Sequence, residues 1–146
     1  RHKNHHLPNV DMGEQRGVLE SMIKVSKEQS ILFLATHLDH RRPDQERRAS
    51  ANFINEMVGQ QKNTPAILAG DLNDGPNSPT LKEIGKLWVR TNPEITPTVP
   101  VTKPLRQIDY ILVRPKERWK VIETQVLDEA VASDHRAIFA VIELVD

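Results

Sequence analysis

The segment PAILAGDLNDGP (residues 65–76) gives the clearest structural signal in this chain. Ala66 to Ala69 is a short, continuous apolar run, which predicts a buried strand that ends at Gly70. Asp71 and Asn73 follow at once, and residues 74–79 are dense in turn-forming residues. The segment therefore places polar side chains directly after a buried strand.

The same arrangement of an apolar run with polar residues at one end recurs three times. The further examples are THLD (36–39), IDYI (108–111) and SDH (133–135). Asp and Asn are common in turns. Four such groups in one chain are hard to explain by turn chemistry alone, so they are candidates for a shared functional site.

The remaining pattern predicts an α/β (α+β) chain with a mixed β-sheet flanked by helices. Apolar residues recur at helical spacing after Pro43, which predicts a helix to about Gln60, and a short helix is expected over 80–87. The order of elements is not that of a doubly wound parallel sheet. Residues 93–104 hold four of the ten prolines and predict an irregular loop. Strands are expected at 18–25, 31–35, 66–70, 107–113, 119–126 and 137–145.

Length and composition indicate one globular domain. The chain has 146 residues, of which 38% are hydrophobic and 27% charged, and the formal net charge is zero. The charge balance indicates neither a nucleic-acid nor a membrane-surface binder. Cysteine is absent, which excludes disulfides and thiolate chemistry, and no apolar run reaches the ~20 residues that a membrane helix needs.

Two clusters of basic residues have two interpretations each. Residues 1–17 are polar and predict an irregular leading segment; His2, His5 and His6 there fit either a flexible loop or a metal-binding group. The basic pairs at 41–42 and 47–48 fit a solvated helix face or a phosphate-binding stripe.

Because the chain starts at Arg1 without an initiator Met, we expect it to be a piece of a longer protein.

Asp71 and Asn73 form the first candidate pair. If the chain stays extended after the strand, side chains at i and i+2 point to the same side, so a carboxylate and an amide converge. Such a pair can bind a hard cation and orient a water or a phosphoryl oxygen. The alternative is an ordinary turn after a strand, which Gly75 and Pro76 would favour.

The other groups supply carboxylates and imidazoles. Asp134 and His135 are adjacent, so both can serve one site only from a loop or a strand start, as an oxygen ligand and a proton carrier. Asp109 lies in an apolar run, where a charge needs a partner. A histidine is the obvious one, and a structural hydrogen-bond network is the alternative. His37 could equally be an ordinary strand-end histidine.

Together the candidates are oxygen-rich and carry two imidazoles. Zinc sites favour sulfur or several imidazoles, so the set favours hydrolysis of a phosphoester assisted by Mg²⁺ or Mn²⁺. Two other metallohydrolase patterns fail. The HLDH stretch (37–40) has Ala35 where a metallo-β-lactamase motif needs its first histidine, and the histidine motifs of calcineurin-like phosphoesterases are missing.

The four groups, in this order and at these spacings, resemble the endonuclease/exonuclease/phosphatase (DNase I-like) family from about Gly13 onward. The resemblance implies a divalent-metal-dependent hydrolase, of phosphodiesterase, nuclease or phosphatase type. His37 would contact the phosphate, Asp71 would position or deprotonate the attacking water, and Asn73 would hold phosphoryl oxygens. Asp109 would orient His135, which would bind the scissile phosphate. The implied metal ligands are Asp134, Asp71 and Asn73.

Members of that family have two similar halves packed sheet against sheet in a four-layer sandwich. The resemblance implies that residues 1–146 are the C-terminal part of such a domain, without the half that carries the principal glutamate metal ligand. The expected partners are therefore the missing N-terminal half or a second copy of the chain, and a phosphoester substrate. That substrate would be a nucleic acid, a phospholipid head group or a sugar phosphate. The competing hypothesis is a non-catalytic binding or structural half.

Overall fold

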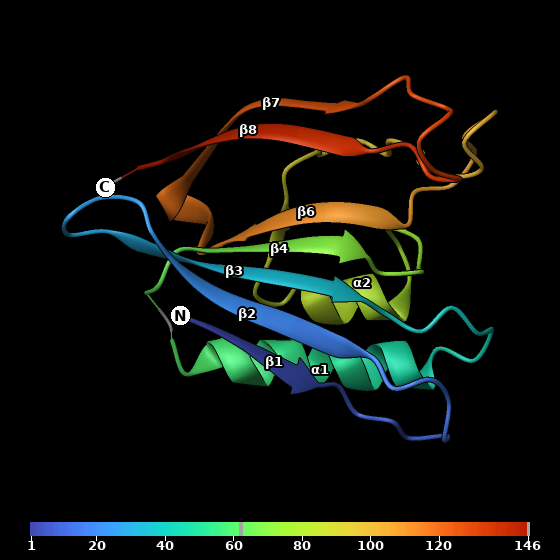
Figure 1. Cartoon of the computed structure of the whole chain (residues 1–146), viewed down its shortest axis with the longest axis horizontal. Coiled ribbons are helices and arrows are strands. Elements are labelled where there is room, and N and C mark those ends of the chain that lie inside the picture. Colours follow the sequence, from blue (N-terminus) through green and yellow to red (C-terminus); the bar gives the residue numbers. More distant parts are fainter. Residues whose placement is uncertain (62, 146) are drawn as a thin grey trace.

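The structure is a computed structural model that describes residues 1–61 and 63–145. It contains a six-stranded sheet, a separate two-stranded sheet and two helices (Figure 1). The strands are β1 (His2–His6), β2 (Gly17–Lys24), β3 (Ser30–His37), β4 (Ala66–Asp71), β5 (Val89–Arg90), β6 (Asp109–Arg114), β7 (Trp119–Val126) and β8 (Ile138–Leu144). The helices are α1 (Gln45–Gly59) and α2 (Pro79–Ile84), and a 3₁₀ turn spans Lys116–Arg118.

The six-stranded sheet is mixed, as the sequence predicts. Its strand order is β1-β2-β3-β4-β6-β5. Only β3 and β4 pair in parallel, through the connection that contains α1, and the other neighbours are antiparallel. Strands β7 and β8 form their own antiparallel pair on the side of β6 away from the helices (Figure 1). The predicted fold class is therefore confirmed.

The hydrophobic core lies between the sheet and the two helices. Alternate residues of β3, β4 and β6 point to this side and are almost completely buried, among them Leu34, Leu68 and Leu112. Helix α1 contributes Ile54 and Val58, both fully buried. Burial of each such side chain is worth ~1.5–3 kcal/mol. Neither helix in the described part of the chain is long and apolar enough to cross a membrane.

The opposite face of the sheet is also apolar but only partly covered. Phe33, Ile67 and Ile111 point to this face and are half-buried. Toward the sheet edge, Leu19 and Ile23 are each 42% exposed. An apolar face of this kind is a typical docking surface.

Two buried arginines connect the helices to the sheet. Arg114, at the end of β6, donates from Nη1 to the carbonyl oxygens of Val58 and Gln61, where α1 ends. Arg47, in the first turn of α1, is buried and pairs with Asp74 through Nε at 3.2 Å. The solvated-face interpretation is therefore wrong for Arg47, because its charge is neutralised inside the protein.

The predicted irregular segment over residues 1–17 is also wrong in part, because His2–His6 forms strand β1. Its polar sequence carries no alternating pattern, since an edge strand can be held by backbone pairing to β2 alone. His5 Nε2 lies 2.7 Å from Glu20 Oε2 across that pairing. The two-residue strand β5 was not predicted either, and the segment 93–104 is irregular as expected.

Gly70 lies beside Thr36 in the pairing of β4 with β3. Its φ of 147° lies outside the range that other residues readily adopt, and a Cβ atom there would lie 1.9 Å from the Thr36 carbonyl oxygen. Backbone cannot move aside as a flexible side chain can. Glycine is therefore required at this point of the sheet.

We predict that Gly70→Ala lowers the free energy of unfolding by ~3 kcal/mol or more, through steric and backbone strain. The matched control is Gly59→Ala at the end of α1, where a Cβ atom meets nothing within 4 Å. That change should be neutral or stabilise by ~0.5–1 kcal/mol. Urea denaturation of both variants would measure the difference, and equal stabilities would contradict the role assigned to Gly70.

Candidate active site

Strand pairing places three of the predicted residues in one row. The register pairs His37 of β3 with Asp71 of β4, and Asp71 with Asp109 of β6. All three side chains point to the sheet face away from the helices, because they share the parity of the half-buried residues on that face. The row lies at the C-terminal ends of β3 and β4 and at the N-terminal end of β6.

Asp71 is the centre of this row. Its Oδ1 accepts a hydrogen bond from the Asn73 backbone N–H at 2.7 Å, and its Oδ2 lies 3.4 Å from His37 Nε2. Burial raises the pKa of Asp71 above its ordinary value, and the charge of Asp109 raises it further. The Asn73 N–H, His37 and His135 act in the opposite direction.

Asp109 pairs with His135, as its burial among apolar residues predicts. His135 Nδ1 lies 3.1 Å from Oδ1 and 3.0 Å from Oδ2 of Asp109. An Nδ1–H donated to this carboxylate leaves Nε2 as the free acceptor of the ring. His135 comes from the loop between β7 and β8, so the pair joins two parts of the chain that are 26 residues apart.

Asn73 does not continue the strand, so the extended geometry expected for Asp71 and Asn73 is wrong. Asn73 adopts a left-handed conformation with φ of 51°. The turn bends the chain back, and the Asn73 Nδ2 group donates to the Leu38 carbonyl oxygen at 2.9 Å. Asn73 thus connects the loop after β4 to the loop after β3, and still has one amide N–H and its Oδ1 for other partners.

Asp134 and Asp39 lie outside the row. Asp134 is exposed in the β7–β8 loop, and its backbone oxygen accepts a hydrogen bond from Val101 N. Both Asp134 and His135 are in a loop, as their adjacency requires. Asp39 is almost fully buried and holds Arg41 Nε at 3.0 Å, so its carboxylate belongs to an ion pair away from the row.

The ligand atoms of Asp71, Asp109 and His135 lie within 4.8 Å of one another, and in the described ranges 1–61 and 63–145 this is the group of acidic and histidine side chains that could hold a metal ion. Two carboxylates this close repel each other, as the raised pKa of Asp71 reflects. A divalent cation would relieve that repulsion, and carboxylate oxygens are the ligands that Mg²⁺ and Mn²⁺ prefer. The donor set therefore fits such an ion.

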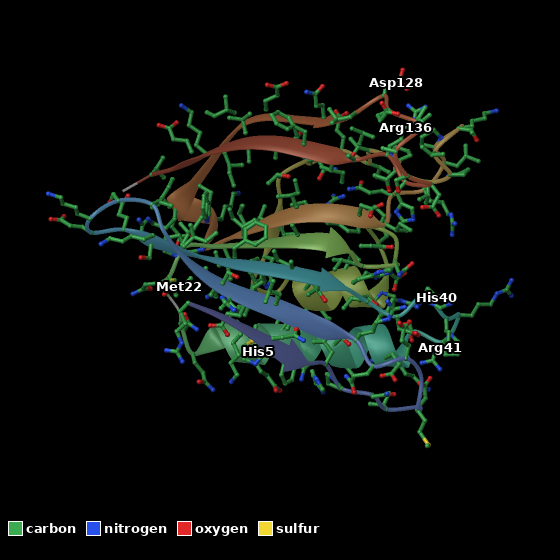
Figure 2. All side chains as sticks on the ribbon, viewed as in Figure 1. His5, Met22, His40, Arg41, Asp128 and Arg136 are labelled. Carbon is green, nitrogen blue, oxygen red and sulfur yellow. The ribbon has the colours of Figure 1, made fainter. Side chains whose placement is uncertain are left out.

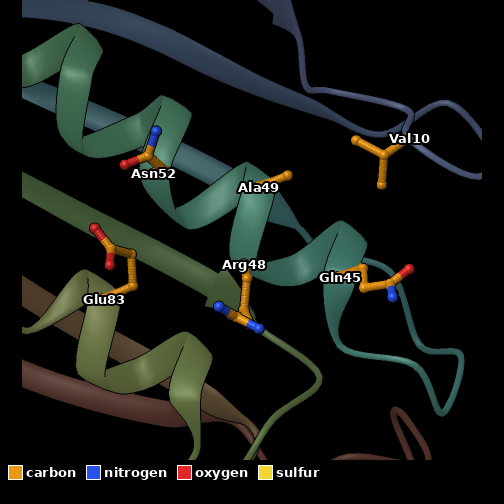
Figure 3. A pocket seen from close by; sticks show the side chains of 6 residues that line it. All are labelled: Val10, Gln45, Arg48, Ala49, Asn52 and Glu83. Carbon is orange, nitrogen blue, oxygen red and sulfur yellow. The ribbon is translucent and has the colours of Figure 1, made fainter.

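A shallow hollow on the sheet face gives access to the row. Its lining includes Asp71 and Asp109, together with apolar residues of β4, β6 and Ile138 at the start of β8. A different hollow lies over α1, between Val10, Arg48 and Glu83 (Figure 3). None of the candidate residues lines this second hollow. Asp71 and Asp109 line the first, and Asn73 lines another hollow between the loop after β4 and the proline-rich loop.

The family model of the endonuclease/exonuclease/phosphatase family matches residues 4–135, which include all four polar groups. The chain belongs to this family. The resemblance seen in the sequence is thereby confirmed. A comparison with curated proteins gives no match.

Solved structures with the same fold agree with this assignment. A functionally unknown conserved protein from Enterococcus faecalis V583 aligns with a TM-score of 0.84 and 22% identity, over 99% of this chain and 66% of its own. The mannosyl-6-phosphatase Bt3783 of Bacteroides thetaiotaomicron gives 0.79 and 20%, over 99% and 66%. D. rerio TDP2, complexed with a single-strand DNA product, gives 0.72 and 16%, over 97% and 67%.

The chain therefore spans about two thirds of the lengths of these proteins. Identities of this size show the fold. Family membership rests on the family model that matches residues 4–135.

One polar residue that contacts the row was not found from the sequence. Thr98 is completely buried, and its Oγ1 donates to Asp109 Oδ2 at 2.5 Å. It belongs to the proline-rich loop that the sequence marks only as irregular. A threonine in such a loop carries no pattern that distinguishes it from Thr96 or Thr102.

The raised pKa of Asp71 has a consequence for stability. A folded state that raises the pKa of a carboxyl group loses stability as the pH rises through that pKa, because the charged form is the disfavoured one. We predict that Asp71→Asn raises the thermal midpoint relative to the wild type, and that the difference grows between pH 4 and pH 8 in EDTA.

The control for this prediction is Glu28→Gln, which neutralises an exposed carboxylate. Its midpoint difference should stay small at every pH. Differential scanning calorimetry would measure both series. A variant Asp71→Asn that is less stable than the wild type at pH 8 would contradict the desolvation argument.

Proposed function

We propose that this chain carries the catalytic residues of a divalent-metal-dependent phosphoester hydrolase. The main supporting observation is the row of His37, Asp71 and Asp109 with His135 against it, in which the ligand atoms of Asp71, Asp109 and His135 lie within 4.8 Å of one another. A carboxylate that can take a proton and imidazoles that can contact a phosphate are the groups that this reaction needs.

Asp71 positions the attacking water and accepts its proton. Its environment supports this role, because a raised pKa brings a carboxylate closer to the basicity of a useful general base. With both ring nitrogens protonated, His135 donates Nδ1–H to Asp109 and Nε2–H to an oxygen of the scissile phosphate. The contact from Asp109 to Nδ1 sets the orientation of the ring and stabilises a positive charge on it.

His37 and Asn73 act on the phosphate from the other side of Asp71. His37 is 57% exposed, so it is free to contact a phosphate oxygen while Nε2 stays near Asp71. Asn73 uses its remaining amide N–H to hold a phosphoryl oxygen, with its loop fixed by the bond to Leu38. Donors that are already oriented stabilise developing charge without reorganisation.

Asp71, Asn73 and Asp134 are the proposed ligands of Mg²⁺ or Mn²⁺, because Asp109 and His135, the other members of the three-residue group, are paired with each other. When bound, the ion would neutralise charge on the phosphate and act as a Lewis acid. Asp134 is exposed beside His135, and Asp71 already belongs to the group of possible ligands. The oxygen donors fit a hard cation better than zinc.

The proposed substrate is a phosphoester, and the kind of molecule that carries it is not assigned further. The named neighbours act on or bind different molecules, a mannosyl phosphate in one case and single-strand DNA in another. Nucleic acid, phospholipid head group and sugar phosphate therefore remain the candidates. The chain's zero net charge favours a substrate with few phosphates over a long polyanion.

We further propose that a longer form of the protein covers the open apolar face of the sheet. The matched structures are about one and a half times as long as this chain, and the half-buried side chains of β3, β4 and β6 lie on the face that remains accessible. A second copy of the chain is the alternative cover.

We predict that hydrolysis of bis-p-nitrophenyl phosphate requires Mg²⁺ or Mn²⁺ and stops in EDTA. His135→Ala and Asp71→Asn should each lower turnover by ~100-fold or more, through loss of a phosphate contact and of a general base. His2→Ala, an exposed histidine on β1, is the matched control and should keep full turnover. Phosphate release from a mannose phosphate and from a short DNA would then rank the substrate classes.

Metal-dependent turnover that survives His135→Ala would remove that residue from the mechanism. Absence of turnover in this chain, restored when the protein is extended upstream of Arg1, would support the metal ligand expected in the other half. Absence of turnover in both forms would favour the non-catalytic hypothesis.

We predict that the isolated chain self-associates through its open sheet face. Phe33→Ser together with Ile111→Ser should shift it toward the monomer, because both side chains point to that face and lose their apolar contact area. Size-exclusion chromatography with light scattering measures the masses. A clean monomer for the wild-type chain would exclude the second copy as the cover.

A further inference from the structure

The proline-rich loop between β5 and β6 contacts Asp109 and the two residues on either side of His135, Asp134 and Arg136. Thr98, at the middle of this loop, is 0% exposed. Its hydroxyl donates to Asp109 Oδ2 at 2.5 Å, and its carbonyl oxygen accepts from Arg136 N, next to His135, at 2.9 Å. One buried residue therefore binds the carboxylate by its side chain and the histidine loop by its backbone.

We propose that Thr98 is a positioning residue that holds Asp109 in the orientation needed to orient His135. The inference rests on the proposed function, in which His135 contacts the phosphate. Thr98 itself touches neither substrate nor metal in this account. It acts only through Asp109.

The geometry around Asp109 explains why a hydroxyl is needed there. His135 Nδ1 is nearly equidistant from the two carboxylate oxygens, at 3.1 and 3.0 Å, so the histidine alone does not select one rotation of the carboxylate. Asp71, the neighbour across the strand pairing, repels the same group. A charge-assisted bond from Thr98 to Oδ2 fixes the rotation against that repulsion.

The loop that carries Thr98 is itself held firmly to the His135 loop. Thr98 N donates to Arg106 O at 2.8 Å, which closes the loop at its base. Arg136 Nε donates to Val101 O at 2.8 Å, and its Nη1 lies 2.7 Å from Asp128 Oδ1 in the β7–β8 loop (Figure 2). The Thr98 hydroxyl is therefore presented by a fixed backbone, as a positioning group requires.

The simplest alternative is that the Thr98 hydroxyl bonds to Asp109 only because a buried hydroxyl needs a hydrogen-bond partner. Such a hydroxyl would affect stability, and the state of the His135 ring would not depend on it. Thr98→Val removes the hydroxyl at almost constant shape, and Thr98→Ser restores it without the methyl group. This pair of variants separates hydrogen bonding from packing.

The first experiment observes the ring of His135 directly. Long-range ¹H–¹⁵N NMR of the full chain, at one alkaline pH where the imidazole is neutral, reports which ring nitrogen carries the proton. His135→Ala identifies the signal among the six histidines. We expect a dominant Nδ1–H form in the wild type and in Thr98→Ser, and a clear shift toward Nε2–H in Thr98→Val. This readout needs no turnover.

The second experiment measures turnover in a double-mutant cycle. Thr98→Val should lower kcat about tenfold, as expected for a misoriented catalytic group, and Thr98→Ser should stay close to the wild type. In the Asp109→Asn background, Thr98→Val should cause no further loss, because Thr98 acts through the Asp109 carboxylate. Thr98→Ala serves as a second hydroxyl-free variant if the valine variant does not fold.

An unchanged His135 spectrum in folded Thr98→Val or Thr98→Ala would overturn the proposal. So would a spectrum of Thr98→Ser that matches Thr98→Val, since packing would then be the cause. A shifted spectrum in a chain without turnover supports the positioning role and counts against the proposed function alone. The two hypotheses therefore fail separately.

Discussion

The pairing of β4 with β3 on one side and β6 on the other determines the whole candidate site. A slip of one residue in either pairing would turn a side chain of the candidate site to the opposite face of the sheet. The register sets His37, Asp71 and Asp109 in one row, and Gly70 permits the close approach of β3 and β4 beside it. The buried core under the same strands keeps this register fixed.

Within that row the main physical problem is the accumulation of negative charge. Asp71 and Asp109 are neighbours in a partly desolvated place, and the raised pKa of Asp71 is the direct result. The surrounding groups are donors: the Asn73 backbone N–H, the two imidazoles and the Thr98 hydroxyl. A bound cation and a phosphate would complete this balance. This electrostatic imbalance supports the proposal that the site binds a cation and a phosphate.

Hydrogen bonds from side chains, and not secondary structure, connect the loops around the site to one another. Asn73 bonds to Leu38, and Arg47 connects the carbonyl of Asp39 with the carboxylate of Asp74. Thr98 and Arg136 do the same for the two later loops. Each of these hydrogen bonds uses a buried or half-buried polar group that would be costly to leave without a partner. The conformations of these loops and the positions of the site residues therefore depend on each other.

Most of the fold was predictable from the sequence, because apolar runs and helical periodicity report burial directly. The buried strands at 31–35 and 66–70 and helix α1 are examples, and the four polar groups follow from their places at the ends of such runs. Strand β1 was missed because an exposed edge strand needs backbone pairing and no apolar pattern. The left-handed turn at Asn73 was missed because the extended and bent forms share the same local sequence.

The sequence by itself determined the fold class and the family and indicated the candidate site residues, since these follow from local pattern and from the order of the motifs. Only the tertiary structure decided which of those residues meet. It turned Asn73 toward Leu38 and brought in Thr98, which has no distinguishing signal in its loop, whereas the pair of Asp109 and His135 was expected from the sequence. Contacts between distant segments depend on strand register and loop packing, and the local sequence around one residue specifies neither of them.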